Sequence, residues 1–163
     1  MIECLFLPFS KLELLFKVDA DFSAKEPCLN CCGIAPDNLS VATGGDDGVV
    51  RIFKLAQNLK SVEREVVELT GPTGAINSID ISHDGKRLVA TSKDCHAHIF
   101  DLATKKAIQK LSFKYSPGVK NMDMRSAFFR RNNEIYTLSS LPRKPAFVIR
   151  WSPYRDTKLQ GAV

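Results

Sequence analysis

The sequence predicts an all-β protein made of about three blades of a β-propeller. The main observation is an internal duplication, in which residues 39–55 recur 47 residues later as residues 86–102 without a gap. Each copy reads as short strands of alternating apolar and polar residues separated by turns. A unit of about 45 residues has the size of one blade, and closed propellers have about four to eight blades. With 163 residues the chain holds too few blades to close a ring, so we expect an incomplete propeller.

The strands of the second copy can be placed in order. Residues 76–82 alternate apolar and polar side chains and predict the first strand, and the apolar run at residues 88–91 predicts the second. An Asp-Gly pair between them suits a tight turn, because Asp bonds to the nearby backbone and Gly tolerates positive φ. The next turn leads into a third strand at residues 96–100. Asp94 lies in this turn and Asp47 holds the same place in the first copy, so both are predicted to be structural turn residues.

Each copy carries an aromatic residue near the end of its third strand. These residues are Phe53 and Phe100, and a more divergent third copy ends at Trp151. The earlier strands of this third copy are predicted at residues 126–129 and 135–138. We expect the three aromatic side chains to pack between neighbouring blades, because large rings bury the most apolar area.

These features resemble the WD40 repeat, which keeps an aspartate in this turn and a tryptophan where Phe53 and Phe100 stand. The resemblance is incomplete, because the Gly-His pair that usually precedes the first strand is absent from residues 69–74. Since a buried carboxylate needs hydrogen-bond donors, Asp94 must find another partner. Backbone amides or a Ser or Thr hydroxyl are the expected donors.

The chain is basic, with a formal net charge of +5. Part of this charge lies in the C-terminal third, and the residues that we expect to face a protein partner are Arg130, Arg131, Arg143 and Lys144. They would form a face for an acidic protein or for phosphates. The alternative is that they are solvated loop residues of a β protein. No nucleic-acid partner is predicted.

Cysteine and histidine residues do not predict a metal site. Five cysteines, an odd number, favour reduced thiols in a cytosol-facing chain. Cys28, Cys31 and Cys32 lack the fourth ligand of a structural zinc site, and at least one of the last two is expected to be a small core residue. His96 and His98 project from one strand face, which we expect to be exposed. We therefore predict no metal and no cofactor.

No pattern for catalysis is present either. The stretch at residues 44–48 is followed by a strand rather than a helix, so it does not match a phosphate-binding loop. A nucleophile elbow and a metalloprotease helix are absent from the sequence. The chain is expected to be a non-catalytic scaffold with no catalytic residue.

The chain divides into three parts. Residues 1–17 are apolar but interrupted by charges and a proline, and they lack the features of a secretory signal. Residues 18–155 form the partial propeller, and residues 156–163 are a tail. No stretch approaches the roughly 20 apolar residues of a membrane span, so we expect the chain itself to be soluble.

Several segments, in the same order, resemble the membrane-bound guanine nucleotide exchange factors of the endoplasmic reticulum that activate Sar-type small GTPases. The matching segments are residues 18–22, 42–53, 74–76 with 84–86, 113–125 and 136–143. This resemblance implies a seven-bladed propeller on the cytosolic face of the endoplasmic reticulum. It also implies a partner GTPase and a role in COPII vesicle formation and transport to the Golgi.

The same resemblance implies that the chain is only a scaffold fragment of such a factor. The family exchanges nucleotide through a glycine-rich loop of the first blade that binds potassium, and it has a C-terminal membrane anchor. Residues 1–17 do not resemble that loop, and the anchor is missing. We therefore expect no exchange activity from this chain alone. The alternative is a WD40 module that binds other proteins in a multisubunit complex.

Overall fold

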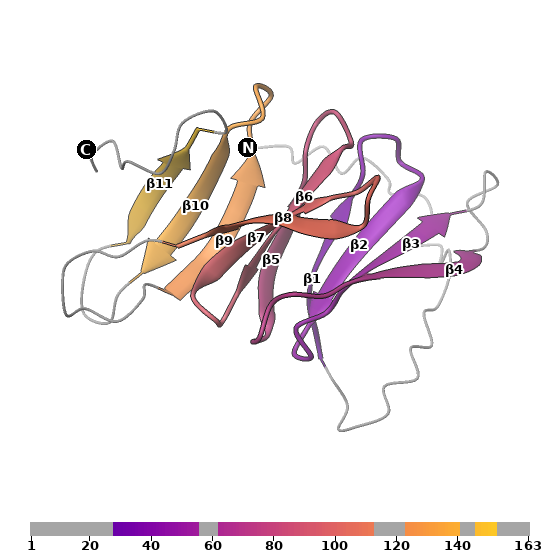
Figure 1. Ribbon diagram of the computed structural model, residues 1–163, viewed down its shortest axis with the longest axis horizontal. Coiled ribbons are helices and arrows are strands. Elements are labelled where there is room, and N and C mark those ends of the chain that lie inside the picture. Colours follow the sequence, from indigo (N-terminus) through magenta and orange to yellow (C-terminus); the bar gives the residue numbers. More distant parts are fainter. Residues whose placement is uncertain (1–27, 56–61, 113–122, 141–145, 153–163) are drawn as a thin grey trace, which may run out of the picture.

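The computed structural model describes residues 28–55, 62–112, 123–140 and 146–152, all as strands and turns. Eleven strands form three antiparallel sheets that stack side by side (Figure 1). The first sheet has the order β1 (Leu29–Ile34), β2 (Ser40–Gly45), β3 (Val50–Leu55) and β4 (Val62–Leu69). The second has the order β5 (Ile76–Ile81), β6 (Arg87–Ser92), β7 (His96–Asp101) and β8 (Lys106–Leu111). The third consists of β9 (Asp123–Phe129), β10 (Ile135–Ser140) and β11 (Phe147–Trp151), with β10 in the centre.

The second sheet lies between the other two, and this explains its burial. Strands β6 and β7 have buried residues on both faces, whereas β8 is exposed along most of its length. A strand that is covered on both sides needs no polar alternation, which is why residues 88–90 form an uninterrupted apolar run. The first strands β1, β5 and β9 contact one another in turn, as the inner strands of stacked blades do.

The duplication extends to the turns. Asn38 and Gly85 both have positive φ, 57° and 68°, in the turns after β1 and β5. Gly48 and Cys95, at 75° and 68°, do the same in the turns after β2 and β6. Cys95 thus adopts the left-handed conformation that Gly48 adopts in the first copy. Gly48 adopts it without strain because glycine has no Cβ. Equivalent turn geometry at an offset of 47 residues shows that the two sheets are copies of one unit.

Two apolar clusters hold the sheets together. The first joins the first and second sheets and contains Val50, Leu69, Ile76 and Phe100, all nearly or fully buried. The second joins the second and third sheets through Val89, Ala97, Ile99, Leu111, Met124, Ala127 and Ile135. Because both faces of the second sheet are used, its residues belong alternately to the two clusters.

The predicted aromatic residues differ in their packing. Phe100 is completely buried in the first cluster, and Trp151 packs against the second. Phe53 is also buried, but it belongs to neither cluster. It alternates with Ile52, which packs against the first cluster, so it points to the face of the first sheet that is turned away from the second. Phe100 and Trp151 therefore lie at boundaries between described sheets, whereas Phe53 lies on a face that no described sheet covers.

The fold class predicted from the sequence is confirmed, since three blade-like sheets are stacked without closing a ring. The strands expected at residues 126–129 and 135–138 lie within β9 and β10. The segments 1–17 and 156–163 lie outside the described residues. Within the part of the chain that is described, no helix is long and apolar enough to cross a membrane.

Candidate functional site

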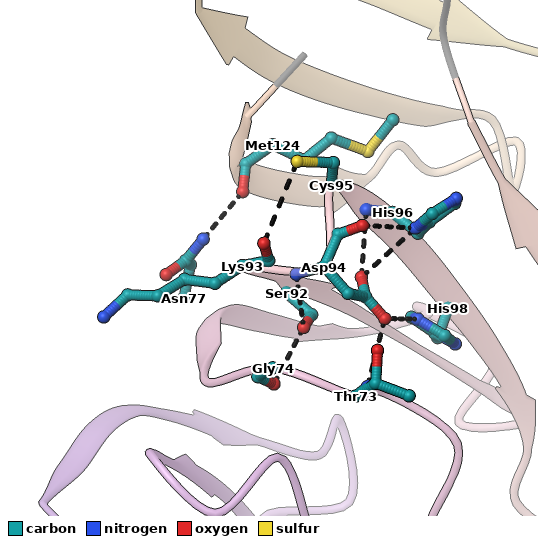
Figure 2. Close-up of polar contacts among 10 residues, drawn as sticks. All are labelled: Thr73, Gly74, Asn77, Ser92, Lys93, Asp94, Cys95, His96, His98 and Met124. Atoms are coloured by element: carbon teal, nitrogen blue, oxygen red, sulfur yellow. Dashed lines mark hydrogen bonds and ion pairs between the residues drawn. The ribbon is translucent and has the colours of Figure 1, made fainter. Parts of the chain in front are cut away.

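Asp94 is the centre of a polar network at the turn between β6 and β7 (Figure 2). Its Oδ2 accepts a hydrogen bond from the backbone amide of Thr73 at 3.1 Å and lies 2.9 Å from Nε2 of His98. Its Oδ1 accepts a bond from the backbone amide of His96 at 3.1 Å. Ser92 Oγ accepts a bond from the Asp94 amide and donates to the carbonyl oxygen of Gly74 at 2.8 Å. The network therefore ties the turn to the segment that precedes β5.

The protonation states in this network follow from its geometry. Burial opposes ionisation of Asp94, but the bonds from the Thr73 amide and from His98 outweigh it, so the pKa of Asp94 lies below its ordinary value. Burial also lowers the pKa of His98, and the hydrogen bond to Asp94 only partly compensates. At neutral pH the pair is thus an ionised carboxylate and a neutral imidazole that donates through Nε2–H.

This geometry shows that the expected exposure of the His98 face is wrong, and it identifies the donors that bind Asp94. The face carrying His98 is not exposed, because the imidazole is 3% exposed and stacks on Phe100 with ring centroids 6.4 Å apart. The backbone amides expected to bind Asp94 do so, but the main side-chain donor is His98, four residues further along the chain. His98 on the third strand thus donates the hydrogen bond to Asp94 that the histidine of a Gly-His pair would otherwise supply. The sequence signal for this pairing is the position of His98, four residues after Asp94.

The first blade uses the same spacing with another residue. Arg51 lies four residues after Asp47 and forms an ion pair with its Oδ2 at 2.6 Å. The guanidinium also reaches Glu68 on β4 at 3.0 Å, while Asp47 Oδ1 accepts a bond from the Val49 amide. Arg51 and His98 occupy equivalent positions of the two copies. Both predicted turn aspartates are therefore paired with a side chain of the third strand.

Among the described residues, no group of three or more His, Cys, Asp or Glu side chains could hold a metal ion. Burial, and then the neighbouring Cys32, raises the pKa of Cys31 to about 11, so its thiol stays protonated at neutral pH. Cys31 packs against the first cluster whereas Cys32 is exposed, as expected for one small core cysteine. A protonated thiol is a weak nucleophile, so Cys31 serves here as a packing residue.

Polar bonds also cross from one sheet to the next. Asn30 on β1 donates to the carbonyl oxygen of Ile76 at 3.1 Å, and Asn77 on β5 donates to that of Met124 at 2.9 Å. The two asparagines occupy equivalent positions of the two copies, so the same inter-sheet bond is made twice. These asparagines are not among the residues predicted from the sequence, although they lie at the same offset of 47 residues as the two turn aspartates.

The third sheet presents an apolar face away from the second sheet. Phe128 and Tyr136 are cross-strand partners whose rings stack at 5.6 Å, and Leu138 and Val148 are paired beside them. Phe128, Leu138 and Val148 are 47%, 37% and 63% exposed. The second cluster includes Ala127 and Ile135, which precede Phe128 and Tyr136 in sequence, so by strand alternation the four side chains occupy the opposite surface. We call these four residues the outward face.

The basic residues predicted to face a partner are only partly described. Arg130 and Arg131 are exposed in the turn between β9 and β10, whereas Arg143 and Lys144 lie outside the described residues. The turn with Arg130 and Arg131 adjoins the turn between β5 and β6, because Asn133 donates to Asp84 at 3.3 Å. Their role in binding stays a prediction.

Stacked four-stranded antiparallel sheets, inner strands in sequential contact and an aspartate at the turn before the third strand define a set of propeller blades. The particular kind of blade follows from the sequence. Residues 17–54 and 63–101 match the family model described as "WD domain, G-beta repeat". These two stretches therefore match the WD40 repeat, and the third sheet is a further blade that lies beyond them.

Similar folds are found among solved structures. The WD40 repeats of RRP9 superpose with a TM-score of 0.59 at 16% identity, covering 78% of this chain and 36% of that chain. The structure of U3-55K superposes with a TM-score of 0.62 at 14% identity, covering 86% of this chain and 40% of that chain. At such identities the likeness concerns the fold, and the present chain spans well under half of either structure. No curated protein matches the chain in sequence.

Proposed function

We propose that the chain is part of a WD40 propeller that binds other proteins within a multisubunit assembly. The observation that carries this proposal is the outward face of the third sheet, with Phe128, Leu138 and Val148 exposed side by side. Contiguous exposed apolar side chains on a sheet mark a surface that is covered in the functional state. WD40 repeats are known as scaffolds for protein contacts, which agrees with this assignment.

The occupant best suited to this face is another propeller blade. Each of the two observed inter-sheet boundaries consists of an apolar cluster flanked by an asparagine-to-carbonyl bond. The outward face offers the same kind of surface, with aliphatic and aromatic side chains on a sheet. A closed propeller needs at least about four blades, so at least one more blade is required for closure. In this proposal the blade that covers the outward face belongs to a partner chain of the assembly.

A scaffold of this kind would act by holding turns and loops in fixed positions. The turns of the second sheet are tied to the preceding segment through Asp94, and the sheets are joined by buried clusters. Loops attached to such a framework can be presented to a partner without a large entropic cost.

A narrower second proposal is that the bound partner is a Sar-type GTPase and that the assembly serves COPII transport at the endoplasmic reticulum. It is supported only by the resemblance of the segments at residues 18–22, 42–53 and 113–125. The matched family and the similar structures concern the WD40 fold in general. The broader proposal of an interaction module is therefore preferred.

The outward face can be tested in the native complex. A photo-cross-linking amino acid placed at Val148 is expected to react with a strand of another WD40 blade, identified by mass spectrometry of the cross-linked peptides. The double variant Leu138→Glu, Val148→Glu should lose this complex in native purification, because two buried carboxylates would lie in an apolar contact. Ile108→Glu is the matched control, since Ile108 is 51% exposed on β8 of the second sheet. Equal complex formation by both variants, or cross-links to no blade, would contradict the proposal.

The second proposal needs a separate measurement. Release of a fluorescent GDP analogue from a Sar-type GTPase would be followed with the purified native complex and with the chain alone. Acceleration by the complex, lost in the Leu138→Glu, Val148→Glu variant, would favour an exchange-factor scaffold. A stable complex that leaves nucleotide release unchanged would retain the broader proposal and exclude the narrower one.

A further inference from the structure

One end of the second and third sheets concentrates positive charge. Because the strands are antiparallel, the turns after β5, β7 and β9 all lie at the same end of the blades. The turns after β5 and β9 both lie at the upper side of Figure 1. The segments 82–87, 101–106 and 130–134 form this end, and their basic residues are Lys86, Arg87, Lys105, Lys106, Arg130 and Arg131. We call these six residues the basic end.

These turns are neighbours in space. Asn133 in the turn after β9 donates to Asp84 in the turn after β5 at 3.3 Å, across the boundary between the sheets. Within the second sheet, Arg87 is the cross-strand partner of Asp101, and Asp101 is in turn the partner of Lys106. The basic residues therefore form one continuous surface instead of three separate loops.

The acidic residues of the same segments are engaged in holding the turns. Asp84 Oδ1 accepts bonds from Ser82 Oγ at 2.7 Å and from the Lys86 amide at 3.1 Å. Asp101 Oδ1 accepts bonds from the amide and the hydroxyl of Thr104, at 2.7 and 2.9 Å. Glu134 is the third acidic residue there, and it accepts a bond from the Tyr136 hydroxyl. These carboxylates offset part of the positive charge, and their oxygens accept the hydrogen bonds that hold the turns.

Most of these basic side chains are exposed, by contrast. Lys86, Lys106, Arg130 and Arg131 are exposed, and none of them forms an ion pair with another residue of the described ranges. At the opposite end of the same two sheets, the described residues in or beside the turns include Asp94 and Asp123 together with Lys93 and Arg125. Among the described turns of these two sheets, the excess of positive charge therefore lies at the basic end, where it favours the approach of a negatively charged partner.

We propose that the basic end binds an acidic segment of a protein partner. This inference rests on the proposed function, because it assigns a second contact surface to the same interaction module. An acidic peptide fits better than a nucleic acid, since single-stranded nucleic acids are held by aromatic rings interleaved with basic residues. The three segments of the basic end contain no Phe, Tyr or Trp. The stacked pair of Phe128 and Tyr136 belongs to the outward face instead.

Fluorescence anisotropy with a labelled deca-glutamate peptide tests the inference on the native complex. Binding is expected at low salt and should weaken as salt rises, because exposed charges are screened. Arg130→Glu, Arg131→Glu should weaken it by about tenfold or more, since both attraction and steering are reversed. The matched control is Lys93→Glu, Lys110→Glu, which removes the same charge from exposed positions away from the basic end. Unfolding midpoints of all variants by circular dichroism establish that they are folded.

The outcomes separate the alternatives. Equal weakening by the two double variants would overturn the inference, because it would show a response to net charge alone. Equal or tighter binding of a labelled oligo-deoxyuridine, lost in Arg130→Glu, Arg131→Glu, would also overturn it and assign the surface to nucleic acid. The cross-link at Val148 should persist in this variant. If the protein formed no complex with another blade but still bound the peptide, the result would count against the proposed function alone.

Discussion

Replacing His98 by alanine removes the main side-chain donor of the Asp94 network. The imidazole is 3% exposed and its Nε2 lies 2.9 Å from Oδ2 of a largely buried carboxylate. A hydrogen bond to a charged group contributes about 1.5–3 kcal/mol, and loss of the ring contact with Phe100 adds about 0.5–1.5 kcal/mol. We therefore expect His98→Ala to lower the free energy of unfolding by about 2–4 kcal/mol. The turn before β7 should be affected most.

Urea unfolding provides the assay, followed by circular dichroism and by fluorescence of the chain's single tryptophan, Trp151. A double-mutant cycle of His98→Ala and Asp94→Ala should give a coupling energy of about 1–3 kcal/mol, because the two side chains share one bond. His83→Ala is the control, since His83 is exposed and its loss should change stability by less than about 0.5 kcal/mol. The reasoning is refuted if His98→Ala is no more destabilising than His83→Ala, or if the coupling is below about 0.5 kcal/mol.

Two further predictions concern pH and packing. Because burial lowers the pKa of His98 below its ordinary 6.5, the unfolded chain takes up its proton first, and stability should fall as the pH drops below 6.5. Denaturant titrations across this range should show a smaller slope for His98→Gln, which keeps an N–H donor without titrating. Gly44→Ala would place a Cβ 2.5 Å from Ile76 Cγ2 of the next sheet, and should cost about 1–3 kcal/mol in urea unfolding.

Each of these has a specific control. An unchanged pH slope in His98→Gln would show that other groups cause the dependence. For packing, Gly33→Ala is the matched substitution, because its Cβ would meet Ile79 at an ordinary 3.6 Å and no positive φ is involved. If Gly33→Ala and Gly44→Ala were equally destabilising, the close approach of the first two sheets at Gly44 would not be the cause.

Much of the fold could be predicted from repetition and alternation. The offset of 47 residues placed Asp47 and Asp94 at equivalent turns, and the alternation of residues 76–82 predicted β5. These signals are local, because turn chemistry and strand period depend on neighbouring residues. They were sufficient for the number of blades and for the absence of closure.

The candidate surfaces could not be predicted in the same way. In β9 and β10 both faces carry apolar side chains, so alternation does not tell which face meets the second sheet. Only the stacking shows that Met124 and Ala127 are buried while Phe128 and Leu138 are exposed. Likewise, the basic residues of three separate turns became one surface only when the antiparallel connections brought them to the same end.

The sequence by itself determined the blade architecture, since repeated strand and turn patterns specify each unit through short-range interactions. The tertiary structure decided that His98 is buried and paired with Asp94, that Phe53 points away from both clusters, and which side of the third sheet stays uncovered. The physical reason is that burial depends on what packs against a strand. In a stack of sheets, the residues that cover a strand belong to a unit about 50 residues away in the sequence. A face at the end of the stack has no such cover among the described sheets.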